Sequence, residues 1–161
     1  MKLTETVEKK DDRQFLVFAI SDQEMGFNIE CVREVLKPQG IHSLVNAPDF
    51  IEGIIYVRKY ALVVISLRKR FGLKSLESGH KERIIICKVN NMIVGFIVDS
   101  VSEVLTVPLK DIQPPPQVLS LQNQGQYVCG LIKVGERLVT LLDLEKIVTG
   151  EELARLSEIK A

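Results

Sequence analysis

The chain has 161 residues, 46% of them hydrophobic, and its 21 lysines and arginines balance its 21 aspartates and glutamates. This much apolar material is enough for a folded core, so the composition excludes a chain that is disordered throughout. The zero net charge disfavours a partner that is held mainly by its phosphates, such as duplex DNA or RNA. No apolar run approaches the ~20 residues of a membrane-spanning helix, and the N-terminus has no apolar signal segment. We therefore expect a cytoplasmic protein without direct membrane insertion.

The first half of the chain predicts strands, turns and one short helix. Residues 1–13 are mostly polar, and we expect a flexible tail there. FLVFAI, residues 15–20, is typical of a strand, and the polar residues that follow indicate a hairpin turn. GIIYVRKYALVVISL, residues 53–67, predicts a further hairpin, after which Ser66 is placed to cap a short helix. The polar residues 74–82 form a natural connector to the second half.

The second half repeats the pattern of the first. VREVL, residues 32–36, matches VSEVL, residues 101–105, together with the strand and turn before each. GIIYVRKYALVVISL matches GLIKVGERLVTLLDL, residues 130–144, in the same order. Two matches in one order indicate an internal duplication. Beyond them, Asp143 is placed to cap a short helix, and Thr149 and Glu152 have capping-box spacing for a C-terminal helix over residues 149–161.

Short, evenly spaced strands with few helices are typical of small antiparallel barrels. We therefore predict a mainly β fold of two small barrels related by the duplication, with short helices and a C-terminal helix. The first β-barrel half is expected over residues 14–73 and the second over residues 83–148, within a single compact domain overall.

The residues that carry enzyme chemistry are sparse and scattered. There are two histidines: His80 lies in the polar connector, where we expect a solvated side chain, and His42 has no nearby cysteine or acid at ligand spacing. No nucleotide-binding or hydrolase motif occurs. The three cysteines form no CxxC pair, which favours reduced thiols over a metal site. Glu34 and Glu103 occupy equivalent repeat positions, which favours a structural or surface role over an acid–base pair. We predict no enzymatic activity, no cofactor and no metal.

Two basic segments keep a small β-barrel nucleic-acid-binding module open as an alternative. RKY at residues 58–60 and RKR at residues 68–70 are basic, and Tyr56 and Tyr60 can stack on bases. The zero net charge favours another explanation, an exposed hairpin tip and a cationic last helical turn beside the helix dipole. The nucleic-acid interpretation requires both basic segments to lie on one face with the two tyrosines exposed. We expect no nucleic-acid partner.

Nearly the whole chain, from about Gln14 to Leu156, resembles the CheW family of chemotaxis coupling proteins. The four segments that carry the resemblance are QFLVFAISDQEMGFNIECVREVL (14–36), NAPDFIEG (46–53), VGFIVDSVSEVL (94–105) and GERLVTLLDLEKI (135–147). Each is weak alone, but their order along the chain is specific. The resemblance implies two five-stranded barrels, in agreement with the repeat.

The resemblance also implies a non-enzymatic scaffold in bacterial chemotaxis, which couples chemoreceptors to the histidine kinase CheA. One surface would bind the cytoplasmic tip of methyl-accepting chemoreceptors, and another, whose residues are unknown, the regulatory domain of CheA. The receptor-binding surface carries over to Val32, Glu34 and Arg58, with Gly53 at the matching position before the central hairpin. A divergent CheW-like adaptor of another chemosensory pathway is the alternative. We expect a monomer outside receptor arrays.

The central hairpin departs from the family pattern. Where the family usually has an Asn-Leu-Arg-Gly turn, a Val-Pro-Val strand and an Asp, this chain has Tyr56–Lys59, then Val63 and Ser66. If the turn keeps a positive φ, Lys59 is strained by roughly 1–2 kcal/mol. We therefore expect the kinase-pairing function to be retained more securely than standard receptor affinity.

Overall fold

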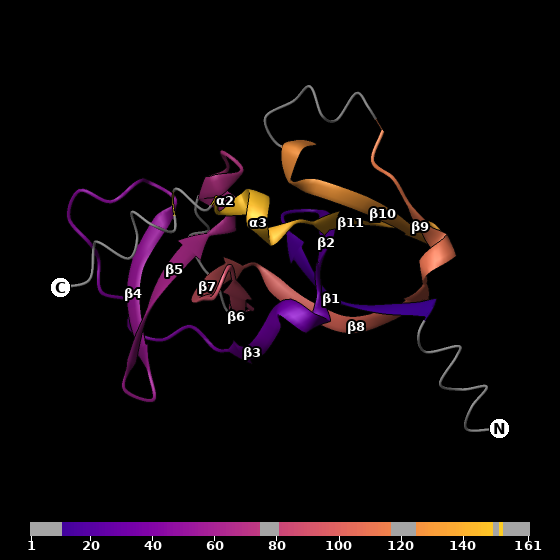
Figure 1. The fold of residues 1–161 in the computed structure, drawn as a ribbon. Helices are drawn as coiled ribbons and strands as arrows, with labels where there is room; N and C mark the ends of the chain where they lie inside the picture. Colours follow the sequence, from indigo (N-terminus) through magenta and orange to yellow (C-terminus); the bar gives the residue numbers. More distant parts are fainter. Residues whose placement is uncertain (1–10, 75–80, 117–124, 150–151, 153–161) are drawn as a thin grey trace.

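The computed structural model describes residues 11–74, 81–116, 125–149 and 152. Most of the predicted tail and connector, and the C-terminal helix apart from Thr149 and Glu152, lie outside these residues. Within the described residues, eleven strands form two sheets, which confirms the mainly β prediction (Figure 1). The first strand begins at Asp12, so the last residues of the predicted tail belong to a strand.

The six-stranded sheet, which we call barrel A, has the strand order β8-β1-β2-β11-β10-β9. Its strands are β1 (Asp12–Ile20), β2 (Gln23–Asn28), β8 (Ser100–Pro108), β9 (Ile112–Gln113), β10 (Val128–Val134) and β11 (Arg137–Leu142). The chain leaves β8 through the short 3-10 helix η2 (Leu109–Asp111), and β9 then pairs with β10. This pairing curls the sheet back toward its other edge, on the right of Figure 1.

The five-stranded sheet, which we call barrel B, has the strand order β3-β6-β7-β5-β4. Its strands are β3 (Val32–Leu36), β4 (Ile51–Val57), β5 (Tyr60–Ser66), β6 (Arg83–Val89) and β7 (Met92–Val98). Past the end of β3, His42 forms a bridge to Ile54 on β4, so the segment that follows one edge strand pairs with the other edge strand. Barrel B lies on the left of Figure 1, with the β4–β5 hairpin projecting from it.

The two sequence halves exchange hairpins, which corrects the expectation that residues 14–73 and 83–148 fold as separate barrel halves. The hairpin β1–β2 completes barrel A, and β6–β7 completes barrel B. Each exchanged hairpin joins its barrel by one antiparallel pairing, β1 with β8 or β6 with β3, and by one parallel pairing, β2 with β11 or β7 with β5. The parallel pairings stand in otherwise antiparallel sheets. The exchange has a physical reason, because β1 is apolar on both faces. Phe15 and Val17 pack inside barrel A, while Leu16 and Phe18 pack in a core shared with barrel B.

The pairing registers of the two barrels confirm the duplication. The β3–β6 ladder has a bulge between Val32 and Glu34. The β1–β8 ladder has one at the equivalent place, between Val101 and Glu103. The β4–β5 and β10–β11 ladders also share a bulge at equivalent positions. A bulge is a specific local geometry, so its repetition follows from common descent of the two halves rather than from similar composition.

The largest core lies between the barrels and joins them into one unit. Phe18 and Phe27 from barrel A pack at a tilt of 53° with ring centroids 4.6 Å apart, and Phe27 meets Phe96 from barrel B edge-on at 5.5 Å. These three rings are fully buried. Each barrel has a smaller core of its own, centred on Val17 and Val139 in barrel A and on Ile55, Val64, Ile84 and Ile86 in barrel B.

The predicted helix caps are confirmed. Ser66 accepts a hydrogen bond from the Lys69 N–H at the start of α2 (Leu67–Arg70), and Asp143 accepts from the Glu145 N–H at the start of α3 (Leu144–Ile147). Thr149 and Glu152 form the expected reciprocal capping box. None of the helices in the described ranges has the length and hydropathy needed to cross a bilayer.

Candidate partner-binding site

The tip of the β4–β5 hairpin is a tight turn with two left-handed residues. Arg58 has φ 50° and Lys59 has φ 81°, which is typical of the type I′ turns that join twisted strands. The β6–β7 turn also has two left-handed residues, Asn90 and Asn91. The short polar side chain of asparagine tolerates the left-handed conformation. Lys59 therefore has the positive φ considered from the sequence, with a strain of roughly 1–2 kcal/mol.

A bidentate ion pair holds this tip against β3. The two terminal nitrogens of Arg58 donate to the two carboxylate oxygens of Glu34 at 3.0 and 2.9 Å. Glu34 raises the pKa of Arg58, chiefly through these hydrogen bonds. The Arg58 side chain remains 74% exposed, so the pair contributes more to orientation than to stability. The structure thus brings together two predicted site residues that are far apart in sequence.

The position of Glu34 in the ladder places it at an open end of barrel B. Glu34 pairs with Ile86 on β6, and residues directly opposite in a ladder point to the same face of the sheet. Ile86 is a core residue of barrel B. Glu34 therefore lies on the interior face of the sheet, and Arg58 meets it where the interior opens to solvent.

The other two predicted residues have structural explanations. Val32 pairs with the buried Cys87 and packs, half-buried, against the core between the barrels. Gly53 has φ +147°, and a Cβ atom on it would overlap the carbonyl oxygen of His42. Neither position contacts the Glu34–Arg58 pair through any hydrogen bond of the described residues, so a binding role for Val32 and Gly53 stays a prediction.

Barrel A contains a related cluster that the sequence did not single out. Arg137 on β11 binds both carboxylate oxygens of Glu24 at 2.7 and 3.0 Å, and it also binds Glu103 at 2.9 Å. The hydrogen bond from Arg137 lowers the pKa of Glu24. The sequence feature that could have pointed to this cluster is the repeat equivalence of Glu34 and Glu103. Glu34 pairs with an arginine of the β4–β5 hairpin, and Glu103 pairs with an arginine of the β10–β11 hairpin. Arg58 and Arg137, however, occupy different positions in their hairpins.

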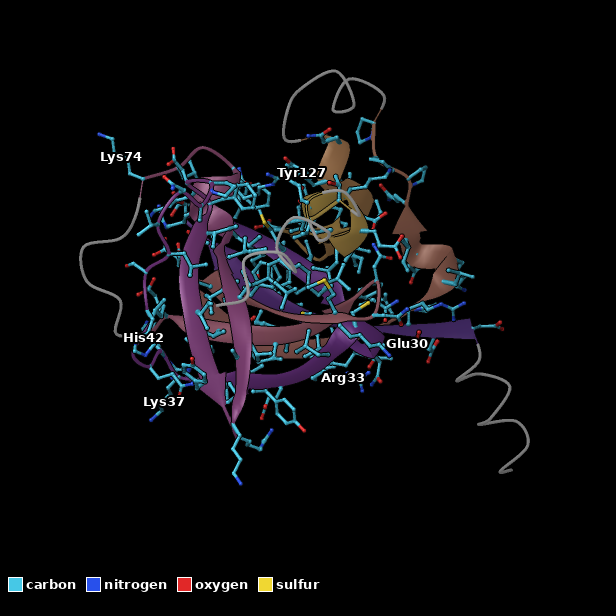
Figure 2. The ribbon with its side chains drawn as sticks, turned by 60° about the vertical axis from the view of Figure 1, so that its left-hand side comes forward. Glu30, Arg33, Lys37, His42, Lys74 and Tyr127 are labelled. Atoms are coloured by element: carbon cyan, nitrogen blue, oxygen red, sulfur yellow. The ribbon has the colours of Figure 1, made fainter. Side chains whose placement is uncertain are left out.

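The basic residues do not gather on one face as the nucleic-acid alternative requires. Arg68 forms an ion pair with Asp99 at 2.8 Å and donates hydrogen bonds to the carbonyl oxygen of Lys74 and the hydroxyl oxygen of Ser21. Arg70 lies over the ring of Phe50 at 4.3 Å and binds Glu152 at 2.9 Å. Both arginine side chains are only 15% exposed. Tyr127, which also flanks Arg70, lies at the opposite end of the molecule from the hairpin tip in Figure 2.

Around the hairpin tip the exposed side chains are basic and aromatic. Arg33 and Lys37 flank the tip on either side in the view of Figure 2, and both are exposed. Tyr56 and Tyr60 are 63% and 72% exposed. Large exposed aromatic side chains close to a pre-ordered arginine are typical of protein-binding surfaces.

A cavity of about 220 Å³ lies beside the start of α2, and its lining includes Glu52, Glu82, Arg68 and Asp99. Burial raises the pKa of Glu82, and the charges of Asp99 and Glu52 raise it further. Neither histidine nor cysteine lines this cavity. Among the described residues, no group of three or more histidines, cysteines and acids is arranged to hold a metal ion.

A family model and individual sequence relatives match this chain to the same family. The CheW-like domain model matches residues 14–152. The chemotaxis protein CheW of Klebsiella aerogenes is 30% identical over 147 residues, covering 91% of this chain and 88% of that protein. The chemotaxis protein CheW of Helicobacter pylori is 34% identical over 135 residues, covering 84% of this chain and 81% of that protein.

A solved structure agrees with the sequence comparison. The crystal structure of the scaffolding protein TtCheW from Thermoanaerobacter tengcongensis superposes with a TM-score of 0.79 at 31% identity, covering 87% of this chain and 94% of that one. Both the family match and the fold extend over both barrels, so the chain belongs to the CheW-like family.

Proposed function

We propose that the protein is a non-enzymatic scaffold of bacterial chemotaxis signalling, which couples chemoreceptors to the histidine kinase CheA in the cytoplasm. Membership of the CheW-like family supports this proposal, since similar proteins are named chemotaxis and scaffolding proteins. The proposal needs no cofactor and no covalent step. Its physical basis is the simultaneous occupation of two surfaces on one rigid body, whose barrels share a continuous core.

The observation that carries the receptor arm of the proposal is the Glu34–Arg58 pair. Both residues were assigned to a receptor-binding surface from the resemblance, and they meet in the structure with bidentate geometry on an exposed tip. A guanidinium that is already oriented loses little side-chain freedom when a partner arrives. Val32 and Gly53 would contribute indirectly, by shaping β3 and the base of the hairpin. The kinase would bind elsewhere, which leaves both partners able to bind together.

The experiment is a pair of binding titrations, one against the regulatory domain of CheA and one against a chemoreceptor tip fragment. Wild type is compared with Arg58→Ala and with Arg137→Ala, which removes the related arginine of barrel A. We expect wild type to bind both partners, Arg58→Ala to lose receptor binding alone, and Arg137→Ala to keep receptor binding.

The other outcomes separate the alternatives. Kinase binding without receptor binding by the wild type would indicate a divergent adaptor with a different input. Equal receptor-binding losses in the two variants would remove the site assignment, and failure to bind either partner would refute the scaffold proposal.

A further inference from the structure

The two tyrosines of the hairpin tip lie on opposite faces of the hairpin. In the β4–β5 ladder Tyr56 pairs with Ala61, and Val57 pairs with Tyr60. Directly opposite residues point to the same face, and neighbouring residues on a strand point to opposite faces. Val57 packs against the core of barrel B. Tyr60 therefore projects from the interior-facing side of the hairpin, and Tyr56 from the outer side.

The internal repeat indicates that Tyr60 lies on the same face of barrel B as Glu34. In the duplication Tyr60 corresponds to Arg137, and Glu34 corresponds to Glu103. In barrel A the side chain of Arg137 reaches Glu103 at 2.9 Å. In barrel B the guanidinium comes instead from Arg58, so Tyr60 occupies the equivalent place without being needed for the ion pair. Tyr60 is left 72% exposed, two residues from Arg58, whose guanidinium is already paired with Glu34.

Tyr56 is held on the outer face by contacts of its own. Its ring meets His42 edge-on with centroids 5.9 Å apart. Its carbonyl oxygen accepts a hydrogen bond from the side-chain amide of Gln39 at 3.3 Å. These contacts belong to the segment that bridges to β4, away from Glu34. Two tyrosines of similar exposure on one hairpin thus have different neighbours.

The surface around Tyr60 defines the chemistry of what it fits. An exposed tyrosine ring offers a large apolar contact area with only two side-chain torsions to immobilise. The carboxylate of Glu34 is neutralised by Arg58, while Lys59 at the tip carries a positive charge with no ion pair among the described residues. The complementary partner surface is an apolar side chain flanked by a carboxylate.

We propose that Tyr60, and not Tyr56, is the aromatic anchor of the receptor-binding surface, and that it takes an apolar side chain flanked by a carboxylate on the receptor's cytoplasmic tip. This inference rests on the proposed function, because the occupant is the receptor arm of that scaffold. It goes further in choosing between the two tyrosines and in stating the chemistry of the contact.

The test titrates a chemoreceptor tip fragment against wild type, Tyr60→Ala, Tyr60→Phe and the matched control Tyr56→Ala. The CheA regulatory domain is titrated in parallel to report the other surface. We expect Tyr60→Ala to weaken receptor binding by about 30-fold or more, the scale of a hot-spot residue. Tyr60→Phe should stay within about 2-fold, because the ring supplies the contact, and Tyr56→Ala should do the same. All four proteins should bind the kinase domain alike.

A second measurement tests the carboxylate. Raising the ionic strength from about 0.1 M to about 1 M shortens the Debye length from about 10 Å to about 3 Å, so a contact between Lys59 and a receptor carboxylate should weaken. Lys59→Gln should therefore show a smaller salt dependence of receptor binding than wild type. An unchanged salt dependence in this variant overturns the carboxylate part.

The failures of the two proposals are distinguishable. If wild type binds the receptor tip and Tyr60→Ala binds it equally well, or if Tyr56→Ala loses as much affinity, the anchor assignment is overturned and the scaffold function stands. If wild type binds the kinase domain but no receptor tip, the anchor assignment falls together with the receptor arm. Binding of an oligothymidine probe that both alanine variants weaken would overturn it in favour of base stacking.

Discussion

Replacing Gly53 by alanine tests how barrel B closes. Gly53 lies on β4 with φ +147°, a conformation that residues with a side chain rarely adopt. An added methyl group would overlap the carbonyl oxygen of His42 and lie 2.8 Å from its carbonyl carbon. Both atoms are backbone, so no side-chain rotation relieves the overlap. The alanine variant must move the segment around His42 away from β4.

The cost follows from what that movement breaks. His42 and Ile54 exchange two backbone hydrogen bonds, each 2.9 Å long. Losing them costs about 0.5–1.5 kcal/mol each, and the unfavourable φ costs about 1–3 kcal/mol. We therefore expect Gly53→Ala to lower the free energy of unfolding by about 2–6 kcal/mol, a large part of the roughly 5–15 kcal/mol that is usual for a domain.

Urea denaturation followed by circular dichroism measures this loss. Gly40→Ala is the control, because a Cβ at Gly40 meets nothing within 4 Å and its φ is ordinary. Gly130→Ala, at the equivalent position of barrel A, should give an intermediate loss, since its Cβ would meet the Ile112 side chain at 3.0 Å without a positive φ. If Gly53→Ala unfolds at the same urea concentration as Gly40→Ala, the closure argument is wrong. If Gly53→Ala then still bound the receptor less tightly, the loss would have to come from a direct contact between Gly53 and the receptor.

Three further predictions concern ionisable groups. Because Arg137 lowers the pKa of Glu24, Glu24→Gln should be less stable than wild type at neutral pH, and thermal melts should show the difference vanish as pH falls through the lowered pKa. The pKa of Glu82 is raised, mainly by burial, so Glu82→Gln should melt at a higher temperature than wild type at neutral pH. This gain in melting temperature should be lost below about pH 4, where the carboxyl group of the wild type is protonated in both the folded and the unfolded state. An equal gain in melting temperature at low pH would contradict this reasoning. Burial raises the pKa of the fully buried Cys87 thiol, so a thiol reagent should label Cys87 only after unfolding. The exposed Cys129 should instead react in the native protein. Its reaction should be slower than that of a free thiol, because burial also raises the pKa of Cys129. Labelling of all cysteines at one rate in the native protein would refute the last prediction.

The features that sequence reasoning predicted correctly are local ones. The caps at Ser66 and Asp143 follow from residue type and spacing, because a cap satisfies N–H groups within one helical turn. The duplication was visible because equivalent strands keep the same residues at bulges. The resemblance assigned Glu34 and Arg58 to one surface, but their meeting as a bidentate ion pair depends on the turn at the hairpin tip, whose shape the sequence did not determine.

By itself, the sequence determined that this protein is built from two related β units, where their turns and caps lie, and that the central hairpin departs from the family pattern. Only the tertiary structure decided which barrel each hairpin completes, because β1 is apolar on both faces and periodicity does not distinguish one core from another. It also decided that Arg68 and Arg70 are occupied by Asp99 and Glu152 while Arg58 stays exposed. Partners that lie far apart in the chain are chosen by packing, and packing is not encoded in any short stretch of sequence.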